Sequence, residues 1–211
     1  MPNRSRARKS TPPSHPTKGK KLPPEVLTED EVRDLIKACS HRAPTGIRNR
    51  ALIVLLYRGQ LRISEALALK PKDLDPKQGT VRVMHGKGDK SRTVGLDAGA
   101  WAIIQRWLDK RKSLGITGRK TVICTLNGDP LLPSYVRTLC KRLGKKAGIE
   151  KRVHPHGLRH TGAFELANEG HPLHVIQQQL GHSSLATTDR YIRHLAPQEV
   201  IDTMKSREWS L

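Results

Sequence analysis

The spacing of apolar residues changes along the chain, and its first part follows the period of an α-helix. Residues 28–39 open with a capping box formed by Thr28 and Glu31, and apolar residues then recur every three or four positions. Residues 51–57 are all apolar and are flanked by charge, which predicts a helix buried on nearly every side and ended at Gly59.

The period then shortens to two, which is typical of strands. Residues 80–84 and 92–96 look like two strands, with Val81 and Val83 two positions apart in the first and Val94 and Leu96 two positions apart in the second. The glycines of segment 86–90 predict a turn between them. Residues 121–124 predict a further short strand, followed by a turn at 127–130. We therefore expect an antiparallel sheet of two or three strands.

Helical spacing returns in the second half of the chain, where glycines supply most of the predicted stops. The helices expected beside the two already described cover 63–69, 97–112 (capped by Asp97), 134–147 (capped by Ser134 and closed by Gly148), 156–169, 172–180, 185–193 and 197–205. The fold class that follows is mostly α with a small antiparallel β-sheet, an α+β arrangement.

The net charge of the chain indicates what kind of partner the protein binds. The chain has 39 Lys and Arg against 19 Asp and Glu, a net charge of +20, which favours a polyanion and above all nucleic acid. The alternative is a generally basic surface of the ribosomal-protein kind. Residues 1–21 hold seven basic residues and no acid, which predicts a disordered basic arm, and the remainder of the chain, 22–211, still carries +13.

The helix predicted over residues 134–147 has two unlike faces. One is an apolar stripe, and no acidic residue answers the cations on the other, so a face that follows DNA phosphates competes with a merely solvated face. The cations assigned to DNA binding on this helix are Arg137, Lys141, Arg142, Lys145 and Lys146.

The cysteines and the hydropathy of the chain indicate its cellular compartment. Cys39, Cys124 and Cys140 show no paired spacing, which favours reduced thiols in a cytosolic protein. The sequence has no apolar run of membrane-spanning length and no apolar core of a signal peptide, so we expect no membrane partner.

Two upstream cations stand in unusual sequence. Arg62 lies between apolar residues with Glu65 three positions on, which predicts either a structural ion pair or an arginine held by that acid and aimed at a phosphate. Lys87 lies between two glycines at the predicted hairpin tip, where a solvated turn lysine is the alternative to a functional one.

Ionisable groups gather in the segment from residue 156 to residue 191. Its candidate residues are His156, Arg159, His160, His182 and Tyr191. Zinc is the other use of clustered histidine, but no Asp, Glu or Cys stands at ligand spacing and the arginines would repel a dication. We therefore expect no metal and no other cofactor.

Four motifs occur in a fixed order: R-I-S-E-A-L-x-L, G-K-G-x-K-x-R, H-x-L-R-H-T and L-G-H-S-S-x-x-T-T-x-x-Y. Together they resemble the signature of the tyrosine recombinase, or phage integrase, family, over the chain from about Leu27 onward. The resemblance implies site-specific breakage and rejoining of double-stranded DNA without a divalent metal. The alternatives are relaxation of DNA in the manner of a type IB topoisomerase, and a DNA-binding regulator that has lost catalysis.

The resemblance also implies a role for each matched residue. Tyr191 would be the nucleophile that forms a 3′-phosphotyrosyl link, and Lys87 would protonate the leaving 5′-oxygen. The remaining activating groups would be Arg62, Arg159, His156 and His182. His156 would take the tyrosine proton, and Glu65 would orient Arg62. Lys90 and Arg92, in the same motif as Lys87, are assigned to DNA binding.

Most members of this family carry a separate helical domain before the catalytic one, whereas here only the 21-residue arm precedes the fold. In this the chain is similar to the small fimbrial phase-variation recombinases, and an isolated catalytic domain is the alternative. The resemblance further implies a cytoplasmic, nucleoid-associated bacterial or phage protein, and a dimer or tetramer on DNA. The helix at 197–205 would dock into a neighbouring protomer, with packing on its own domain as the alternative, and accessory DNA-bending proteins would assist.

Overall fold

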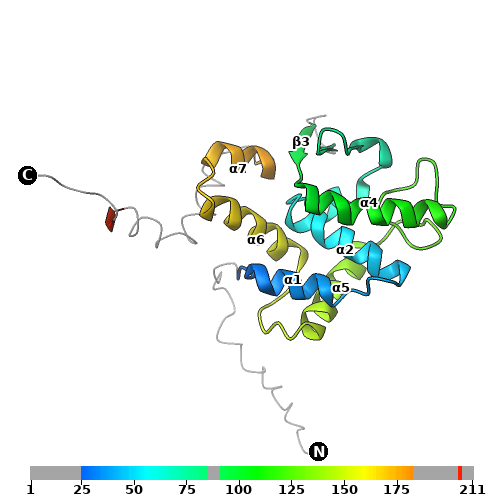
Figure 1. The fold of residues 1–211 in the computed structure, drawn as a ribbon, viewed down its shortest axis with the longest axis horizontal. Helices are drawn as coiled ribbons and strands as arrows, with labels where there is room; N and C mark the ends of the chain where they lie inside the picture. The colour runs from blue at the N-terminus through cyan, green and yellow to red at the C-terminus, as the bar shows by residue number, and fades with distance from the viewer. Residues whose placement is uncertain (1–24, 85–90, 183–203, 206–211) are drawn as a thin grey trace, which may run out of the picture.

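Helix α2 (Pro44–Tyr57) lies at the centre of the fold, as its uninterrupted apolar run predicts. The computed structural model describes residues 25–84, 91–182 and 204–205. In Figure 1, α4 (Ala98–Ser113) and α6 (Pro155–Asn168) lie on either side of α2, and both pack against it. The helix begins earlier than the apolar run because Pro44 stands at a favourable first position and the polar Arg48 and Asn49 are buried with it.

The first helix is fixed by its own sequence. Helix α1 (Glu29–Lys37) has the predicted capping box, in which the Glu31 amide donates to the Thr28 hydroxyl and the Thr28 amide donates to the Glu31 carboxylate. Helix α3 (Ile63–Ala68) follows α2 after a short turn and ends before a 3₁₀ turn, η1 (Pro71–Asp73).

Over the part of the chain that the structure describes, the sheet has three antiparallel strands in the order β1 (Leu74–Asp75), β2 (Thr80–Val83) and β3 (Arg92–Gly95). The predicted antiparallel pair is confirmed, and the additional strand β1 brings it to three. Val81 pairs with Val94, and both side chains are buried, so one face of the sheet closes the core.

The prediction of a strand at residues 121–124 is wrong. Only an isolated bridge between Cys124 and Pro130 forms there. The segment can be buried without joining a sheet because other parts of the chain satisfy its backbone groups. The Val122 amide donates to the Leu69 carbonyl, and the Trp107 indole donates to the Val122 carbonyl.

Of the two predicted caps at the starts of α4 and α5, the structure confirms the first and not the second. Helix α4 is capped by Asp97, as predicted, whose carboxylate accepts from the Ala100 amide. Helix α5 (Pro133–Lys146) instead begins one residue before the predicted cap: Leu132 is its N-cap, and Ser134 lies inside the helix. The reason for the earlier start is Pro133, whose fixed φ suits the first helical position and whose ring lacks the amide that would have no partner there.

Helices α6 and α7 (Leu173–Leu180) pack against each other and lie on the side of α2 away from α4 (Figure 1). The His154 side chain caps α6 by accepting from the Gly157 amide, a cap that the sequence reasoning missed. Gly162 lets α6 approach α2 closely, because a β-carbon there would lie 2.1 Å from the Tyr57 carbonyl oxygen.

Several predicted segments lie outside the described residues. They are the basic arm at 1–21, the hairpin tip at 86–90 and the helix at 185–193. Of the helix predicted at 197–205, only Met204 and Lys205 are described, and both are helical. Within the described ranges, no helix is long and apolar enough to cross a membrane.

Candidate active site

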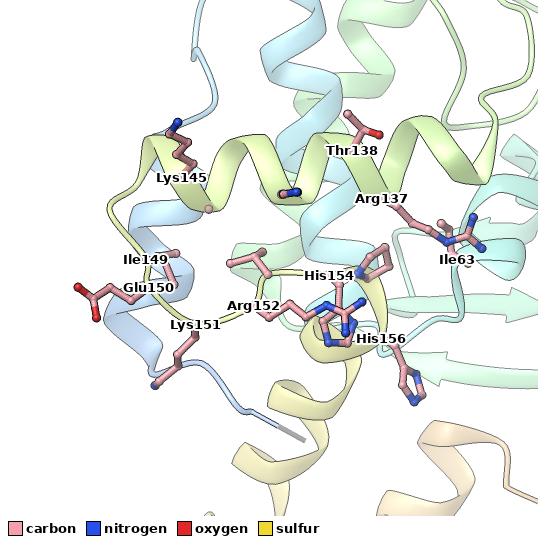
Figure 2. Close-up of a pocket in the computed structure, with 14 residues that line it drawn as sticks. Ile63, Arg137, Thr138, Lys145, Ile149, Glu150, Lys151, Arg152, His154 and His156 are labelled. Carbon is pink, nitrogen blue, oxygen red and sulfur yellow. The ribbon is translucent and has the colours of Figure 1, made fainter. Parts of the chain in front are cut away.

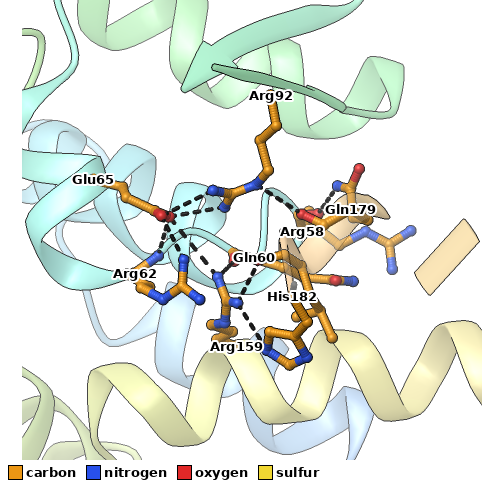
Figure 3. A network of polar contacts seen from close by, with 9 residues as sticks. Arg58, Gln60, Arg62, Glu65, Arg92, Arg159, Gln179 and His182 are labelled. Carbon is orange, nitrogen blue, oxygen red and sulfur yellow. Dashed lines mark hydrogen bonds and ion pairs between the residues drawn. The ribbon is translucent and has the colours of Figure 1, made fainter. Parts of the chain in front are cut away.

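Glu65 and Arg62 form the ion pair that their spacing predicts. Arg62 caps the start of α3, and the Glu65 carboxylate accepts from both the Arg62 backbone amide and its guanidinium, each at 2.8 Å. The Glu65 side chain is 7% exposed, whereas that of Arg62 is 43% exposed. Arg62 is therefore held at its inner side and keeps its outer side open to solvent (Figure 3).

Arg159 reaches the same carboxylate from helix α6. Its side chain is 2% exposed, and its Nη1 lies 3.8 Å from Glu65 Oε2. It donates to two backbone carbonyls, those of Gln60 and Leu180. Gln60 has a positive φ of 49°, an uncommon backbone conformation for a residue other than glycine, in the turn that presents its carbonyl to Arg159.

Arg92 lies where the sequence did not place it. We assigned Arg92 to DNA binding, but its side chain is only 11% exposed and points inward from β3. Both terminal nitrogens donate to the Glu65 carboxylate at 2.8 Å, and its Nε donates to the Gln179 carbonyl at 3.3 Å. The physical reason is visible in the strand: Arg92 stands two residues from the buried Val94 and so shares its inward face.

The arginine cluster, meaning Arg62, Arg92 and Arg159 around Glu65, keeps that carboxylate ionised (Figure 3). Burial by itself raises the pKa of Glu65, but hydrogen bonds from Arg92 and from the Arg62 backbone outweigh it. The net result is a pKa lowered to about 2. Glu65 is thus a fixed negative charge among three positive ones.

His182 follows directly on helix α7 and touches the cluster. Its Nε2 lies 3.3 Å from Arg159 Nη2, and because a guanidinium can only donate, this nitrogen accepts and the ring proton lies on Nδ1. Burial, then the charges of Arg159 and Arg62, lower the pKa of His182 to about 4. The ring is therefore neutral at pH 7 and has an N–H to donate.

Two further histidines lie at the start of α6. His156 is exposed, and its ring meets that of His160 edge-on, with 4.1 Å between centroids. Burial, followed by the charge of Arg159, lowers the pKa of His156. Burial and His156 itself lower the pKa of His160 to about 3. Both rings are therefore neutral bases at pH 7, and His156 is the one that a ligand can reach.

A basic groove leads away from His156. It is a cavity of about 860 Å³ between helix α5 and the segment 149–156, which face each other in Figure 2. Three of the five cations predicted on α5 line it, namely Arg137, Lys141 and Lys145. Lys151, Arg152, His154 and His156 line it as well, and among the described residues Glu150 is the one acid of the lining. We call this cavity the basic groove.

The other two predicted cations of α5, Arg142 and Lys146, are exposed but do not line the groove. Lys146 instead donates to the Ala38 carbonyl at 2.8 Å. Lys87, Lys90 and Tyr191 lie outside the described residues.

The structure thus brings Arg62, Glu65, Arg159 and His182 together, with His156 at the edge of the basic groove. Sequence reasoning missed the inward position of Arg92 and the part played by Gln60. The strand period could have shown the first, since Arg92 and Val94 are two residues apart. No pattern in the sequence could have shown the second, because a carbonyl group is common to every residue.

The mostly helical fold brings two arginines and a neutral histidine together beside a basic groove, and this set of donors suits a phosphate ester. Residues 25–198 match the phage integrase family over most of the chain, and the protein belongs to that family.

Relatives agree with this assignment. The chain is 39% identical over 181 residues to the tyrosine recombinase XerD of Ralstonia nicotianae, covering 84% of this chain and 58% of that protein. It is 34% identical over 186 residues to the tyrosine recombinase XerC of Staphylococcus epidermidis, covering 88% of this chain and 62% of that one. The chain therefore spans about 60% of the length of these curated relatives.

Solved structures share the fold. The crystal structure of XerA recombinase superposes with a TM-score of 0.78 at 34% identity, covering 90% of this chain and 68% of that one. XerH site-specific recombinase, bound to a palindromic difH substrate after cleavage, superposes with a TM-score of 0.72 at 30% identity, covering 88% of this chain and 54% of XerH. The predicted fold class and family are confirmed, and the expected similarity to fimbrial recombinases stays a prediction.

Proposed function

We propose that this chain breaks and rejoins duplex DNA at specific sites through a covalent link between Tyr191 and a 3′-phosphate. The observation that supports the proposal most is the pair of guanidiniums, Arg62 and Arg159, held on one carboxylate beside the neutral His182. A pentacoordinate phosphorane gathers negative charge on its non-bridging oxygens, and fixed cationic donors stabilise that charge.

Each residue has a distinct part in the proposed step. The Tyr191 oxygen attacks phosphorus, the bond to the 5′-oxygen breaks, and a 3′-phosphotyrosyl link and a free 5′-hydroxyl result. His156 takes the tyrosine proton, and Lys87 gives a proton to the leaving 5′-oxygen. The energy of the broken ester bond is kept in the new one, so a 5′-hydroxyl from another strand can reverse the step without ATP.

The histidine geometry suits these parts. His182 accepts from Arg159 on one nitrogen, which leaves its Nδ1–H as the donor to a phosphate oxygen. The lowered pKa of His156, caused by burial and then by Arg159, keeps its ring able to accept a proton at pH 7. Glu65 orients Arg62 and stays charged throughout.

A nicked duplex that loses a short fragment on cleavage tests the reaction, because the lost fragment prevents religation. We expect wild-type protein to form a covalent adduct in the presence of a chelator, and Tyr191→Phe to form none. If the adduct needs a divalent metal, or if Tyr191→Phe still forms it, the proposed reaction is wrong.

A changed leaving group tests the part of Lys87. We expect Lys87→Ala to slow cleavage of normal DNA while sparing a substrate with a 5′-thiol leaving group, which departs without a proton. Equal slowing of the two substrates contradicts the proposed proton transfer.

We also propose that the basic groove holds the DNA backbone beside the site. Arg137, Lys141 and Lys145 line it, so replacing any one by glutamine should lower the slope of log K against log salt by about 0.9 for each lost phosphate contact. Arg142→Gln is the matched control, since this cation is exposed on the same helix but outside the groove. A slope that falls equally in the control contradicts the groove and favours the whole basic face of α5 that the sequence predicted.

We further propose that the chain acts on DNA as a dimer or a tetramer. XerH binds a palindromic substrate, and a palindrome has a two-fold axis that two protomers can share. The expected exchange of the helix at 197–205 and the accessory DNA-bending proteins are further proposals. Sedimentation with one duplex site tests the assembly: a single protomer per full site at saturating protein contradicts it.

A further inference from the structure

Among the three arginines of the cluster, Arg92 makes the most complete contact with the Glu65 carboxylate. Its two terminal nitrogens meet the two carboxylate oxygens at 2.8 Å each, the parallel arrangement in which arginine binds a carboxylate most strongly. Arg159 by comparison stays 3.8 Å away and bonds to backbone carbonyls, and Arg62 uses one terminal nitrogen on the carboxylate. Arg92 is therefore the principal counter-ion of Glu65 (Figure 3).

The fold makes room for this contact. Gly181 lies against the Arg92 side chain: a β-carbon at Gly181 would lie 2.5 Å from Arg92 Cδ and 2.7 Å from its Nε. Gly181 also has the left-handed backbone, φ 64°, that ends helix α7. The same glycine thus ends the helix before His182 and leaves space for Arg92.

Arg92 also joins strand β3 to helix α7. Its Nε donates to the Gln179 carbonyl, and the Gln179 side chain both accepts from the Gly95 amide at 3.1 Å and donates to the Gly95 carbonyl at 3.0 Å. His182 stands three residues after Gln179, so the strand fixes the end of the helix that presents it.

Charge shows why this counter-ion matters. Three guanidiniums and one carboxylate leave a net charge of +2 in the arginine cluster. Without Arg92, the buried carboxylate would draw its neutralising charge from Arg62 and Arg159, and only +1 would face a ligand. Coulomb attraction at such short distances in a poorly solvated site is strong enough to redirect a guanidinium.

We propose that Arg92 is a positioning residue: it neutralises Glu65 and so leaves the charge and the donors of Arg62 and Arg159 to the scissile phosphate. This inference rests on the proposed DNA-cleaving function. It replaces the role in DNA binding that the sequence suggested for Arg92.

The test compares a normal phosphodiester with a methylphosphonate at the scissile position. The methyl group removes one charged non-bridging oxygen, so the transition state carries one negative charge fewer and needs less positive charge from the cluster. Single-turnover cleavage of both substrates is measured for wild type, Arg92→Met and Arg92→Lys. Arg82→Met is the matched control, because Arg82 is an exposed arginine on the neighbouring strand β2.

For Arg92→Met we expect cleavage of the phosphodiester to slow by about 10²-fold and that of the methylphosphonate by less than about 10-fold. Arg92→Lys should lie between Arg92→Met and wild type, since an ammonium restores the charge without the two-pronged contact. Arg82→Met should change neither rate by more than about 2-fold.

Equal slowing of the two substrates by Arg92→Met overturns the inference, because a merely structural loss does not depend on the charge of the substrate. An unchanged phosphodiester rate overturns it as well. The ratio of the two rates within one preparation does not depend on the fraction of folded protein, so partial unfolding cannot imitate the expected result. If wild type forms no adduct on either substrate, the proposed function itself is wrong and this inference falls with it.

Discussion

Replacing Glu65 by glutamine tests how far the fold depends on the negative charge inside the arginine cluster. Glutamine keeps the shape of the side chain and one carbonyl oxygen, but it lacks the charge that Arg62 and Arg92 contact at 2.8 Å. Because the Glu65 side chain is 7% exposed, little solvent is present to screen the loss.

The size of the effect follows from the pKa. That of Glu65 falls from an ordinary 4.5 to about 2 in the folded chain. A carboxylate with a depressed folded pKa stabilises the fold fully above the unfolded value, and the stabilisation is lost as pH falls from 4.5 toward 2. The shift corresponds to roughly 3 kcal/mol at pH 7 and to roughly 1.4 kcal/mol at pH 3.

Urea unfolding followed by circular dichroism measures this difference between wild type and Glu65→Gln from pH 7 to pH 3. We expect the gap in unfolding free energy to shrink to about half over that range, because below pH 4.5 the unfolded chain takes up a proton at Glu65 while the folded carboxylate stays ionised until about pH 2. Glu150→Gln removes an exposed carboxylate and should open no gap of comparable size. A gap that stays constant down to pH 3, or no gap at pH 7, refutes the reasoning.

Three more predictions concern protonation, a hydrogen bond and a close approach. His182 and His160, whose pKa values burial lowers to about 4 and about 3, should stay neutral in NMR titrations down to pH 5, and protonation near 6.5 would contradict this. The stability linked to the two neutral rings is lost progressively as pH falls from 6.5 toward 4 for His182 and toward 3 for His160. Tyr57→Phe removes the hydroxyl that donates to Glu165 and should lower the unfolding free energy by about 1 to 3 kcal/mol in urea, with DNA binding unchanged. Gly162→Ala should cost about 1 to 3 kcal/mol or more, since its β-carbon would collide with the Tyr57 carbonyl; a neutral effect in thermal unfolding would mean that α6 can move off α2 freely.

Local sequence determined the elements whose signals lie within a few residues of one another. The capping box of Thr28 and Glu31 and the cap at Asp97 form as predicted, because each needs only a side chain and an amide three residues away. The pairing of Arg62 with Glu65 is of the same kind. The alternation of residues 80–83 and 92–95 likewise decided which strand face is buried.

Other features depend on chain segments that meet only in the fold. Residues 121–124 have the composition of a strand, but their backbone bonds to Leu69 and Trp107, far away in the sequence, and no ladder forms. The composition of residue 134 suits a cap, yet α5 begins one residue earlier, with Pro133 at its first position and Leu132 as its N-cap.

The candidate site divides in the same way. The sequence motifs alone selected Arg62, Arg159 and His182 as a group, and they converge although 120 residues separate the first from the last. The strand period could place Arg92 on the inward face of β3, but only the tertiary structure brings its guanidinium within 2.8 Å of the Glu65 carboxylate. A buried carboxylate must be neutralised by whichever cations the fold brings within reach, and a linear sequence does not state those distances.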